Sequence, residues 1–387
     1  MNRVYLDHNG TTPMVPEVRE RLLELLDAGL GNASANHDAG RRARAVIDDA
    51  RQRIAGALEV SEESLLFTSG GTESNNAALR GALAAAQPGV GLVVSTIEHA
   101  SVLETARALG AEGRPLAFAP VDEYGVLRVA ECATLAAERH CGLISVMLAN
   151  NEVGAIAPVA ELAEALEDLG AARPLWHCDA VQALGRLPLR LRKWGIDLAS
   201  FSGHKIGGPS GVGLLYRRPG VDLGALLTGG GQETGLRSGT ENVPAIGALA
   251  LAVERAVENR AAYASRSAAQ TMALWCGLRD KFPGARVAGP GFDADERLPN
   301  TLNILFEQVD GRTLVARLDL EGVEASLGSA CASGASEVSH VMLALGYTSE
   351  EARTALRLSI GWNTTDEDIH RAVDIMGRTI PLMRASP

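Results

Sequence analysis

Short apolar runs alternate with longer helical patterns along the first two hundred residues, and this alternation constrains the fold more than any other feature. The runs at 64–69 and 91–96 have the length of strands, and each precedes a stretch with alanine and leucine at helical spacing. The same pairing recurs at 142–150, and a further apolar run follows at 174–180. Alternation of this kind indicates an α/β domain with a largely parallel central sheet.

A smaller α/β unit is predicted towards the C-terminus. The stretch 244–282 has no proline after Pro244 and is rich in alanine and charge, which predicts one or two long helices leaving the sheet. The runs at 298–306 and 355–362 are typical of strands. The sequence Thr364-Thr365-Asp366-Glu367 predicts a capping box at the start of the last helix.

Charge and cysteine usage exclude several classes of protein. The net charge is −11, with scattered basic residues, which argues against a nucleic-acid partner. The five cysteines are odd in number, widely spaced and without a CxxC pair, so we expect neither a disulfide framework nor a metal site. The first ten residues lack the apolar core of a signal peptide, and no apolar run is long enough to span a membrane. A cytoplasmic protein is the expectation.

A glycine-rich turn follows the first predicted strand of the sheet. The sequence Thr68-Ser69-Gly70-Gly71-Thr72-Glu73 ends that strand and opens a helix. Two glycines allow backbone N–H groups to approach an anion closely, and a helix N-terminus favours negative charge. An ordinary strand–helix turn is the alternative, and no Gly-Lys-Ser/Thr follows to make a Walker loop.

Asp179 and Lys205 each follow an apolar run of strand length. In an open α/β sheet the carboxyl ends of strands are where ligands bind. A carboxylate at Asp179 could keep a pyridinium nitrogen protonated, although an aspartate there could also cap a helix. Lys205 precedes the tight turn Gly207-Gly208-Pro209, and a lysine on a rigid, partly desolvated element suits Schiff-base chemistry.

The glycine-rich turn, the aspartate and the lysine occur in the order found in fold-type I enzymes that use pyridoxal 5′-phosphate (PLP). The chain resembles the NifS/IscS-like cysteine desulfurases of the class V aminotransferase group from its first strand to its last helix. The resemblance implies a fold-type I transferase with a large PLP-binding domain at 14–253 and a small domain made of 1–13 plus 254–387. The segments that carry it are Tyr5-Leu6-Asp7, Thr11-Thr12-Pro13, Gly31-Asn32-Ala33-Ser34 with His37 and Gly40, 67–76 (FTSGGTESNN), Asn150-Asn151-Glu152 with Gly154, Asp179-Ala180 with Gln182, Ser202-Gly203-His204-Lys205 with Gly208-Pro209, 229–233 (GGGQE), Arg237-Ser238-Gly239-Thr240, Gly328-Ser329-Ala330-Cys331 and Arg357.

The resemblance also implies a role for individual residues. Lys205 should carry PLP, Asp179 should hold its ring nitrogen, and His99 should stack on its ring and move protons. Thr240 should reach the phosphate in the neighbouring subunit, which implies a homodimer. Arg357 should pair with the carboxylate of L-cysteine, a use suited to its planar donor fork. The phosphate should be held by Gly71, Thr72, Ser202 and His204, and the ring oxygen by Asn151 and Gln182.

Cys331 is the expected sulfur acceptor. It stands in a run of small residues, 328–336, between a predicted strand and a predicted helix, and a thiolate there should take sulfur from cysteine as a persulfide and pass it to an acceptor protein. The acceptor and its pathway stay open: iron–sulfur cluster biosynthesis, tRNA thiolation, thio-cofactor synthesis and DNA sulfur modification all fit.

Two other functions remain open at this point. One is a related PLP lyase acting on selenocysteine or another cysteine derivative, and the other is a non-catalytic partner subunit that keeps the fold. Seven positions depart from the family pattern and bear on the substrate pocket and the pathway: His8, Asn9, Gly10, Ser210, Thr234, Leu327 and Trp362.

Overall fold

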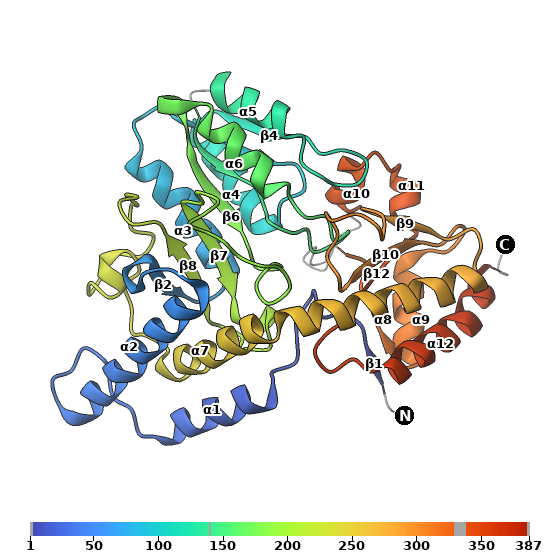
Figure 1. Ribbon diagram of the computed structural model, residues 1–387, viewed down its shortest axis with the longest axis horizontal. Helices are drawn as coiled ribbons and strands as arrows, with labels where there is room; N and C mark the ends of the chain where they lie inside the picture. Colours follow the sequence, from blue (N-terminus) through green and yellow to red (C-terminus); the bar gives the residue numbers. More distant parts are fainter. Residues whose placement is uncertain (1–2, 139–140, 329–337, 385–387) are drawn as a thin grey trace.

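The computed structural model describes residues 3–138, 141–328 and 338–384. A seven-stranded sheet forms the centre of the larger part of the molecule (Figure 1). From β7 to β4 its neighbours run parallel, and only β8 is antiparallel to both of its neighbours. The predicted, largely parallel α/β sheet is confirmed. In sheet order the strands are β2 (Leu65–Thr68), β8 (Gly213–Arg217), β7 (Leu198–Ser202), β6 (Leu175–Asp179), β5 (Cys141–Ser145), β3 (Gly91–Ser95) and β4 (Leu116–Ala119).

Helices cover both faces of this sheet because its strands are apolar on both sides. Successive residues of a strand point to opposite faces, and in β3 Leu92 and Val94 join one core cluster while Val93 joins another. The first cluster packs under α3 (Gly71–Ala85) and α4 (Ala100–Ala111). The second packs under α2 (Asp38–Leu58), α5 (Val129–Glu138), α6 (Val159–Glu167) and α7 (Val243–Glu258). Helix α1 (Pro16–Asp27) lies against α7.

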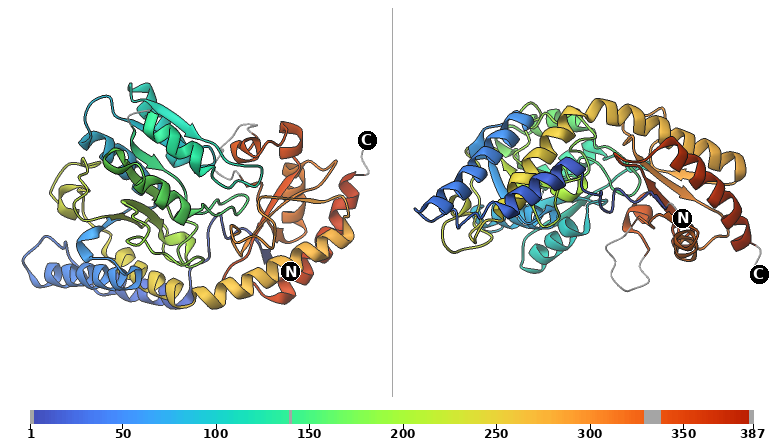
Figure 2. Two further views of the ribbon diagram at one scale, coloured as in Figure 1. Left: turned by 45° about the horizontal axis from the view of Figure 1, so that its top comes forward. Right: turned by 90° about the horizontal axis from the view of Figure 1, so that it is seen from below.

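The predicted long helices are α7 and α8 (Arg260–Lys281), which follow one another along one side of the molecule towards the C-terminal elements (Figure 1). There α8 packs against α12 (Asp366–Arg384), and both cover a three-stranded antiparallel sheet (Figure 2). Its order is β12 (Ala355–Ser359), β10 (Thr301–Leu305) and β9 (Arg286–Ala288). Three shorter helices, α9 (Gly311–Leu320), α10 (His340–Ala344) and α11 (Ser349–Ala352), complete this part.

The N-terminal strand belongs to the C-terminal core although the chain places it far away. β1 (Val4–Tyr5) pairs in parallel with β11 (Val323–Glu324), and Val4 and Leu6 are buried in the same cluster as Leu302. This pairing supports a small domain that includes both ends of the chain. The boundaries 1–13 plus 254–387 and 14–253 stay a prediction.

The predicted capping box of the last helix is displaced by one residue. Thr365 caps α12, with its Oγ1 accepting from the backbone N–H of Asp368 at 3.1 Å, and Asp368 accepts in return from Thr365 N–H at 3.1 Å. Thr364 instead accepts from Gly361 N–H at 3.0 Å. The helix begins one residue later than expected, so Asp368 rather than Glu367 closes the box. No helix in the three described ranges is long and apolar enough to cross a membrane.

Candidate active site

A cavity of about 570 Å³ lies at the carboxyl ends of β6 and β7, where α3 and α4 begin. Open α/β sheets bind ligands in this position. One wall comes from the large sheet, and Arg357 of β12 and Asn9 of the N-terminal segment close the other side. The cavity is lined by ten of the residues predicted for the site: Gly71, Thr72, His99, Asn151, Asp179, Gln182, Ser202, His204, Lys205 and Arg357.

Two predicted residues are not among the lining. Thr240 is exposed and lies outside this cavity, so within one chain it does not complete the site. Cys331 falls outside the described residues. The other cysteines need no function in the site: Cys132, Cys141 and Cys178 are buried, and burial raises the pKa of the first two thiols to about 12 and about 11.

Asp179 is a buried carboxylate that faces the cavity. It is only 4 % exposed, and its oxygens accept from Asn75 Nδ2 at 2.7 Å and from the backbone N–H of Val181 at 3.0 Å. Both donors are neutral, and no basic side chain in the described ranges forms an ion pair with it. A buried charge is costly unless it is paired. A cation in the cavity, such as a protonated ring nitrogen, therefore fits beside Asp179.

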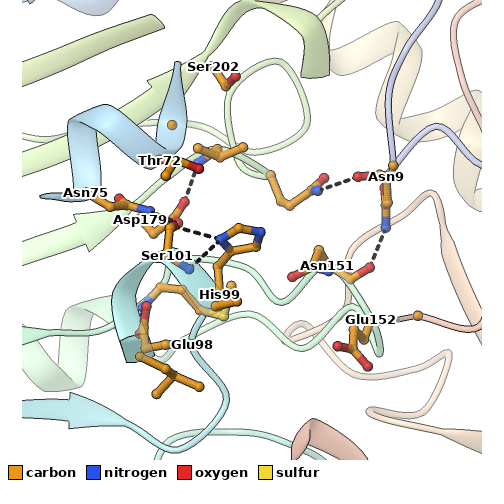
Figure 3. Close-up of a pocket in the computed structure, with 18 of the residues that line it drawn as sticks. Asn9, Thr72, Asn75, Glu98, His99, Ser101, Asn151, Glu152, Asp179 and Ser202 are labelled. Carbon is orange, nitrogen blue, oxygen red and sulfur yellow. Dashed lines mark hydrogen bonds between the residues drawn. The ribbon is translucent and has the colours of Figure 1, made fainter. Parts of the chain in front are cut away.

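His99 is joined to Asp179 through two side chains (Figure 3). Asn75 Nδ2 donates to Ser101 Oγ at 2.8 Å as well as to Asp179, and Ser101 Oγ lies 2.7 Å from His99 Nδ1. Nδ1 also accepts from the backbone N–H of Ser101 at 3.1 Å, as the N-cap of α4. Because a backbone N–H can only donate, Nδ1 is the unprotonated nitrogen and the imidazole carries its proton on Nε2.

Lys205 brings an amine into the same cavity. It closes a single 3₁₀ turn, Gly203–Lys205, directly after β7, so a rigid strand end positions it. Its Nζ donates to the backbone carbonyls of Asn9 and Gly10, at 2.6 Å each. The neighbouring His204 is half-buried, and burial together with the Lys205 charge lowers its pKa to about 4. Its Nδ1 lies 3.0 Å from Thr11 Oγ1.

The first turn of α3 opens on the cavity and suits an anion. A helix leaves its first N–H groups without partners inside the helix, and here Gly71 and Thr72 line the space in front of them. A Cβ at Gly71 would lie 2.9 Å from Val181 Cγ2. The absence of a side chain at Gly71 therefore lets the turn pack closely against Val181. Gly70 has φ 152° and ψ −176°, a conformation nearly confined to glycine. Ser202 adds a hydroxyl to this cradle.

Arg357 reaches the cavity but already has partners. Its Nη2 donates to Asp7 Oδ1 at 2.5 Å, and its Nη1 donates to the backbone carbonyls of Asn151 at 3.1 Å and Gly328 at 3.0 Å. The side chain is 1 % exposed. The guanidinium is therefore held in place before any ligand arrives.

Several residues of the site have no role in the sequence interpretation. Asn9 is the most connected of them: its carbonyl accepts from Lys205 and from Gln182 Nε2, and its amide donates to Asn151 O at 3.1 Å (Figure 3). Asn9 was expected to matter only as a departure from the family pattern. No local signal marks it, because its partners come from five distant segments of the chain.

Glu98 lies in the cavity wall and is completely buried. Its Oε1 accepts from Ser95 Oγ at 2.9 Å and from the backbone N–H of Met147 at 2.5 Å. Burial, and then the charge of Asp179, raise its pKa well above the ordinary value. The raised pKa disfavours the charged form of Glu98. No cluster of metal ligands occurs in the described ranges.

Comparisons with known proteins identify the family of this chain. Residues 4–372 match the Aminotransferase class-V family. A cysteine desulfurase IscS of Dictyoglomus turgidum is 38 % identical over 98 % of this chain and 95 % of its own length, and one of Methanosarcina thermophila is 38 % identical over 98 % and 93 %. A solved NifS-like protein superposes with a TM-score of 0.91 at 35 % identity, covering 98 % of this chain and 100 % of its own. SspA, solved in complex with cysteine, has a TM-score of 0.78 at 31 % identity and covers 92 % and 98 %.

The family uses PLP, and the residues of this cavity fit that cofactor. They provide an unpaired carboxylate at Asp179 for the ring nitrogen, an amine at Lys205 and an anion cradle at Gly71 and Thr72. Gln182 has a buried Oε1 without a hydrogen-bond partner, which is available to a group in the cavity. By family match, full-length relatives and cavity chemistry together, the chain belongs to the NifS/IscS-like cysteine desulfurases within the class V aminotransferases.

Proposed function

We propose that this chain is a cysteine desulfurase that converts L-cysteine to L-alanine and transfers the sulfur to Cys331. The observation that carries the proposal is Asp179: a buried carboxylate whose hydrogen-bond donors among the described residues are neutral, in one cavity with the amine of Lys205. A partner subunit that merely kept the fold would gain nothing from burying an unpaired charge beside a free cavity.

PLP, when bound, draws electrons away from the Cα of an attached amino acid. Asp179 favours this chemistry by holding a proton at the ring nitrogen, since its carboxylate is fixed by Asn75 and Val181. The neutral amide of an asparagine could not do the same. We expect Asp179→Asn to lose most of the activity while retaining the fold.

Lys205 and His99 handle the protons. Lys205 Nζ would serve as the base for the proton on the substrate Cα, and the carbonyls of Asn9 and Gly10, which accept from Nζ, would hold the resulting ammonium. His99 presents Nε2–H to the cavity, because its Nδ1 is committed to Ser101. The site therefore has two separate groups for proton transfer: Lys205 as the base and His99 as a neutral proton donor.

Arg357 binds the substrate carboxylate, and Asn151 and Gln182 orient the ring and the substrate. Asn9 O accepts from the side-chain amide of Gln182, and Asn9 Nδ2 donates to the backbone carbonyl of Asn151. The Gln182 side chain and the Asn151 backbone are therefore pre-positioned, which lowers the entropy lost on binding.

Cys331 acts as the sulfur acceptor. Its thiolate attacks the sulfur of the substrate, the C–S bond breaks, and the substrate Cβ gains a proton to become alanine. The sulfur remains bonded to Cys331 as a persulfide, so one cysteine yields one alanine and one transferable sulfur, with no external oxidant. A soft thiolate is needed for attack on sulfur.

The test is Cys331→Ser. A serine hydroxyl is a poor nucleophile towards sulfur, so this variant should retain bound PLP and bind L-cysteine, yet release almost no alanine. In the wild-type protein, mass spectrometry after incubation with cysteine and without reductant should find one added sulfur on the peptide that contains Cys331. Borohydride reduction followed by peptide mapping should place the cofactor on Lys205, with Lys193 and Lys281 as the alternatives in the sequence.

Alanine release by Cys331→Ser at the wild-type rate would contradict the proposal. The protein would then be a lyase that expels sulfide directly. The cavity residues do not distinguish cysteine from selenocysteine as the substrate. Kinetics on the two amino acids, measured side by side, test for the related activity on selenocysteine.

The site is further proposed to be completed in a homodimer. Thr240 is exposed and stands outside the cavity of its own chain, as expected for a residue that serves a neighbouring subunit. The sulfur acceptor would be a separate protein whose identity is open.

A further inference from the structure

Asp7 pairs with Arg357 at the edge of the cavity. The guanidinium is already oriented by two backbone carbonyls on Nη1, those of Asn151 and Gly328, and by burial at 1 % exposure. Asp7 adds the contact of Oδ1 with Nη2 at 2.5 Å. Because the orientation is fixed without it, the main contribution of Asp7 is its negative charge.

Gly10 gives the carboxylate of Asp7 the space it occupies. The two residues close one turn, in which Gly10 N–H donates to Asp7 O at 3.0 Å. A Cβ at position 10 would lie 2.4 Å from Asp7 Oδ2 and 2.9 Å from its Cγ, closer than real contacts allow. The φ of Gly10 is not in the left-handed region, so alanine could adopt the backbone, and the carboxylate of Asp7 would have to move away.

We propose that Asp7 occupies Arg357 as an internal substitute for the carboxylate of the amino-acid substrate, and that Gly10 is the residue that permits this. The inference rests on the proposed function in one respect, the pairing of Arg357 with the substrate carboxylate. Asp7 prevents a buried arginine from remaining unpaired before the substrate binds.

A second carboxylate beside the paired guanidinium would meet the like charge of Asp7. Substrate binding therefore requires Asp7 to leave Arg357. The Asp7 side chain is 24 % exposed, so it has access to water when it moves. The competition raises KM without entering the chemical step, so kcat should be insensitive to it.

The test is a double-mutant cycle on the PLP-loaded enzyme. Asp7→Asn keeps the size of the side chain and removes its charge, so the KM for L-cysteine should fall about fivefold with kcat unchanged, as for the loss of one partly exposed ion pair. Binding of L-alanine, measured by calorimetry, should tighten by the same factor. Gly10→Ala should also lower the KM for L-cysteine. The double variant should match Asp7→Asn alone, because Gly10 acts through Asp7.

Two control variants separate the competition from general effects. Asp319→Asn removes a carboxylate that pairs with Arg3 on the outside of the protein, and it should leave KM unchanged. Gly56→Ala lies in α2, where a Cβ would meet nothing within 4 Å, and should likewise have no effect on KM.

A rise of KM in Asp7→Asn would overturn the proposal, since it would make Asp7 an orienting residue instead. Additive effects of Asp7→Asn and Gly10→Ala would also overturn it. Arg357→Gln distinguishes a failure of the proposed function from a failure of the competition. An unchanged KM in that variant would mean that Arg357 does not bind the substrate. A large rise there, with no change in Asp7→Asn, would refute the competition alone.

Discussion

Asn75 joins Asp179 to His99 through a single amide group. Its Nδ2 donates to Asp179 Oδ2 and to Ser101 Oγ, and Ser101 contacts the imidazole. Asp179 and His99 are thereby coupled. Asn75 stands inside the motif that marks the family, yet the sequence interpretation gave it no task. Its contacts exist only because the fold brings α3 next to α4 and the end of β6.

At the residue scale, His8 also makes the stability of the folded protein depend on pH. The imidazole is 1 % exposed, neither ring nitrogen has a hydrogen-bond partner, and its edge contacts Tyr5 at a centroid distance of 4.9 Å. Burial, and then the charge of Arg186, lower its pKa from 6.5 to about 3. Between these two values the unfolded chain binds a proton that the folded chain does not, so stability falls as pH falls.

His8→Asn should reduce this loss. For one buried histidine the free energy of unfolding changes by about 1.4 kcal/mol per pH unit between the two pKa values. The variant should therefore show a shallower decline than the wild type in urea unfolding at pH 7, 6 and 5. His177, with a pKa lowered by burial to about 3, keeps its own contribution in both proteins. Parallel declines would mean that His8 is protonated in the fold.

At the scale of elements, strand ends and helix starts position the chemistry. β6 ends at Asp179, β7 ends three residues before Lys205, and α3 and α4 begin at Gly71 and directly after His99. Parallel strands place their carboxyl ends at one edge of the sheet, which brings these residues together. The helix start of α3 adds backbone donors that no side chain could replace.

Gly70→Ala should weaken PLP binding by disturbing the start of α3. The φ of 152° and ψ of −176° at Gly70 disfavour a Cβ by about 1–3 kcal/mol, and relief of that strain would turn the first N–H groups of α3 away from the phosphate. We expect a lower PLP content at limiting cofactor, measured by absorbance, with circular dichroism unchanged. Gly56→Ala in the interior of α2 is the matched control. Equal PLP affinity in the two variants would show that the turn does not hold the phosphate.

At the scale of the whole molecule, one chain brings nearly all of the site together from its two halves. Asn9 binds Thr301 Oγ1 at 2.8 Å and Ser359 Oγ through its backbone N–H at 2.9 Å, while its carbonyl receives Lys205. The N-terminal segment therefore connects β10 and β12 to the large sheet. Among the described residues that were predicted for the site, Thr240 is the exception, because it lies outside the cavity of its own chain.

A mixing experiment tests whether Thr240 serves the neighbouring subunit. Lys205→Ala removes the amine, and Thr240→Glu would place a carboxylate against the phosphate of the partner site. Each homodimer should be inactive, but random reassortment should recover about a quarter of the wild-type sites, because half of the dimers are mixed and each mixed dimer has one intact site. Thr134→Glu, at an exposed position of α5, is the control and should be active alone. No recovery, or a fully active monomer by light scattering, would contradict the homodimer.

The sequence by itself determined the fold class and most of the cavity. Strand–helix alternation and glycine spacing are local, so they predicted the parallel sheet, the anion turn and the strand-end positions of Asp179 and Lys205. Tertiary structure alone decided which distant groups meet these residues. Asp7 facing Arg357 and Asn9 receiving Lys205 are contacts between segments that are far apart in the sequence. Local propensity carries no information on such contacts, because they form only when the packed core fixes the segments relative to one another.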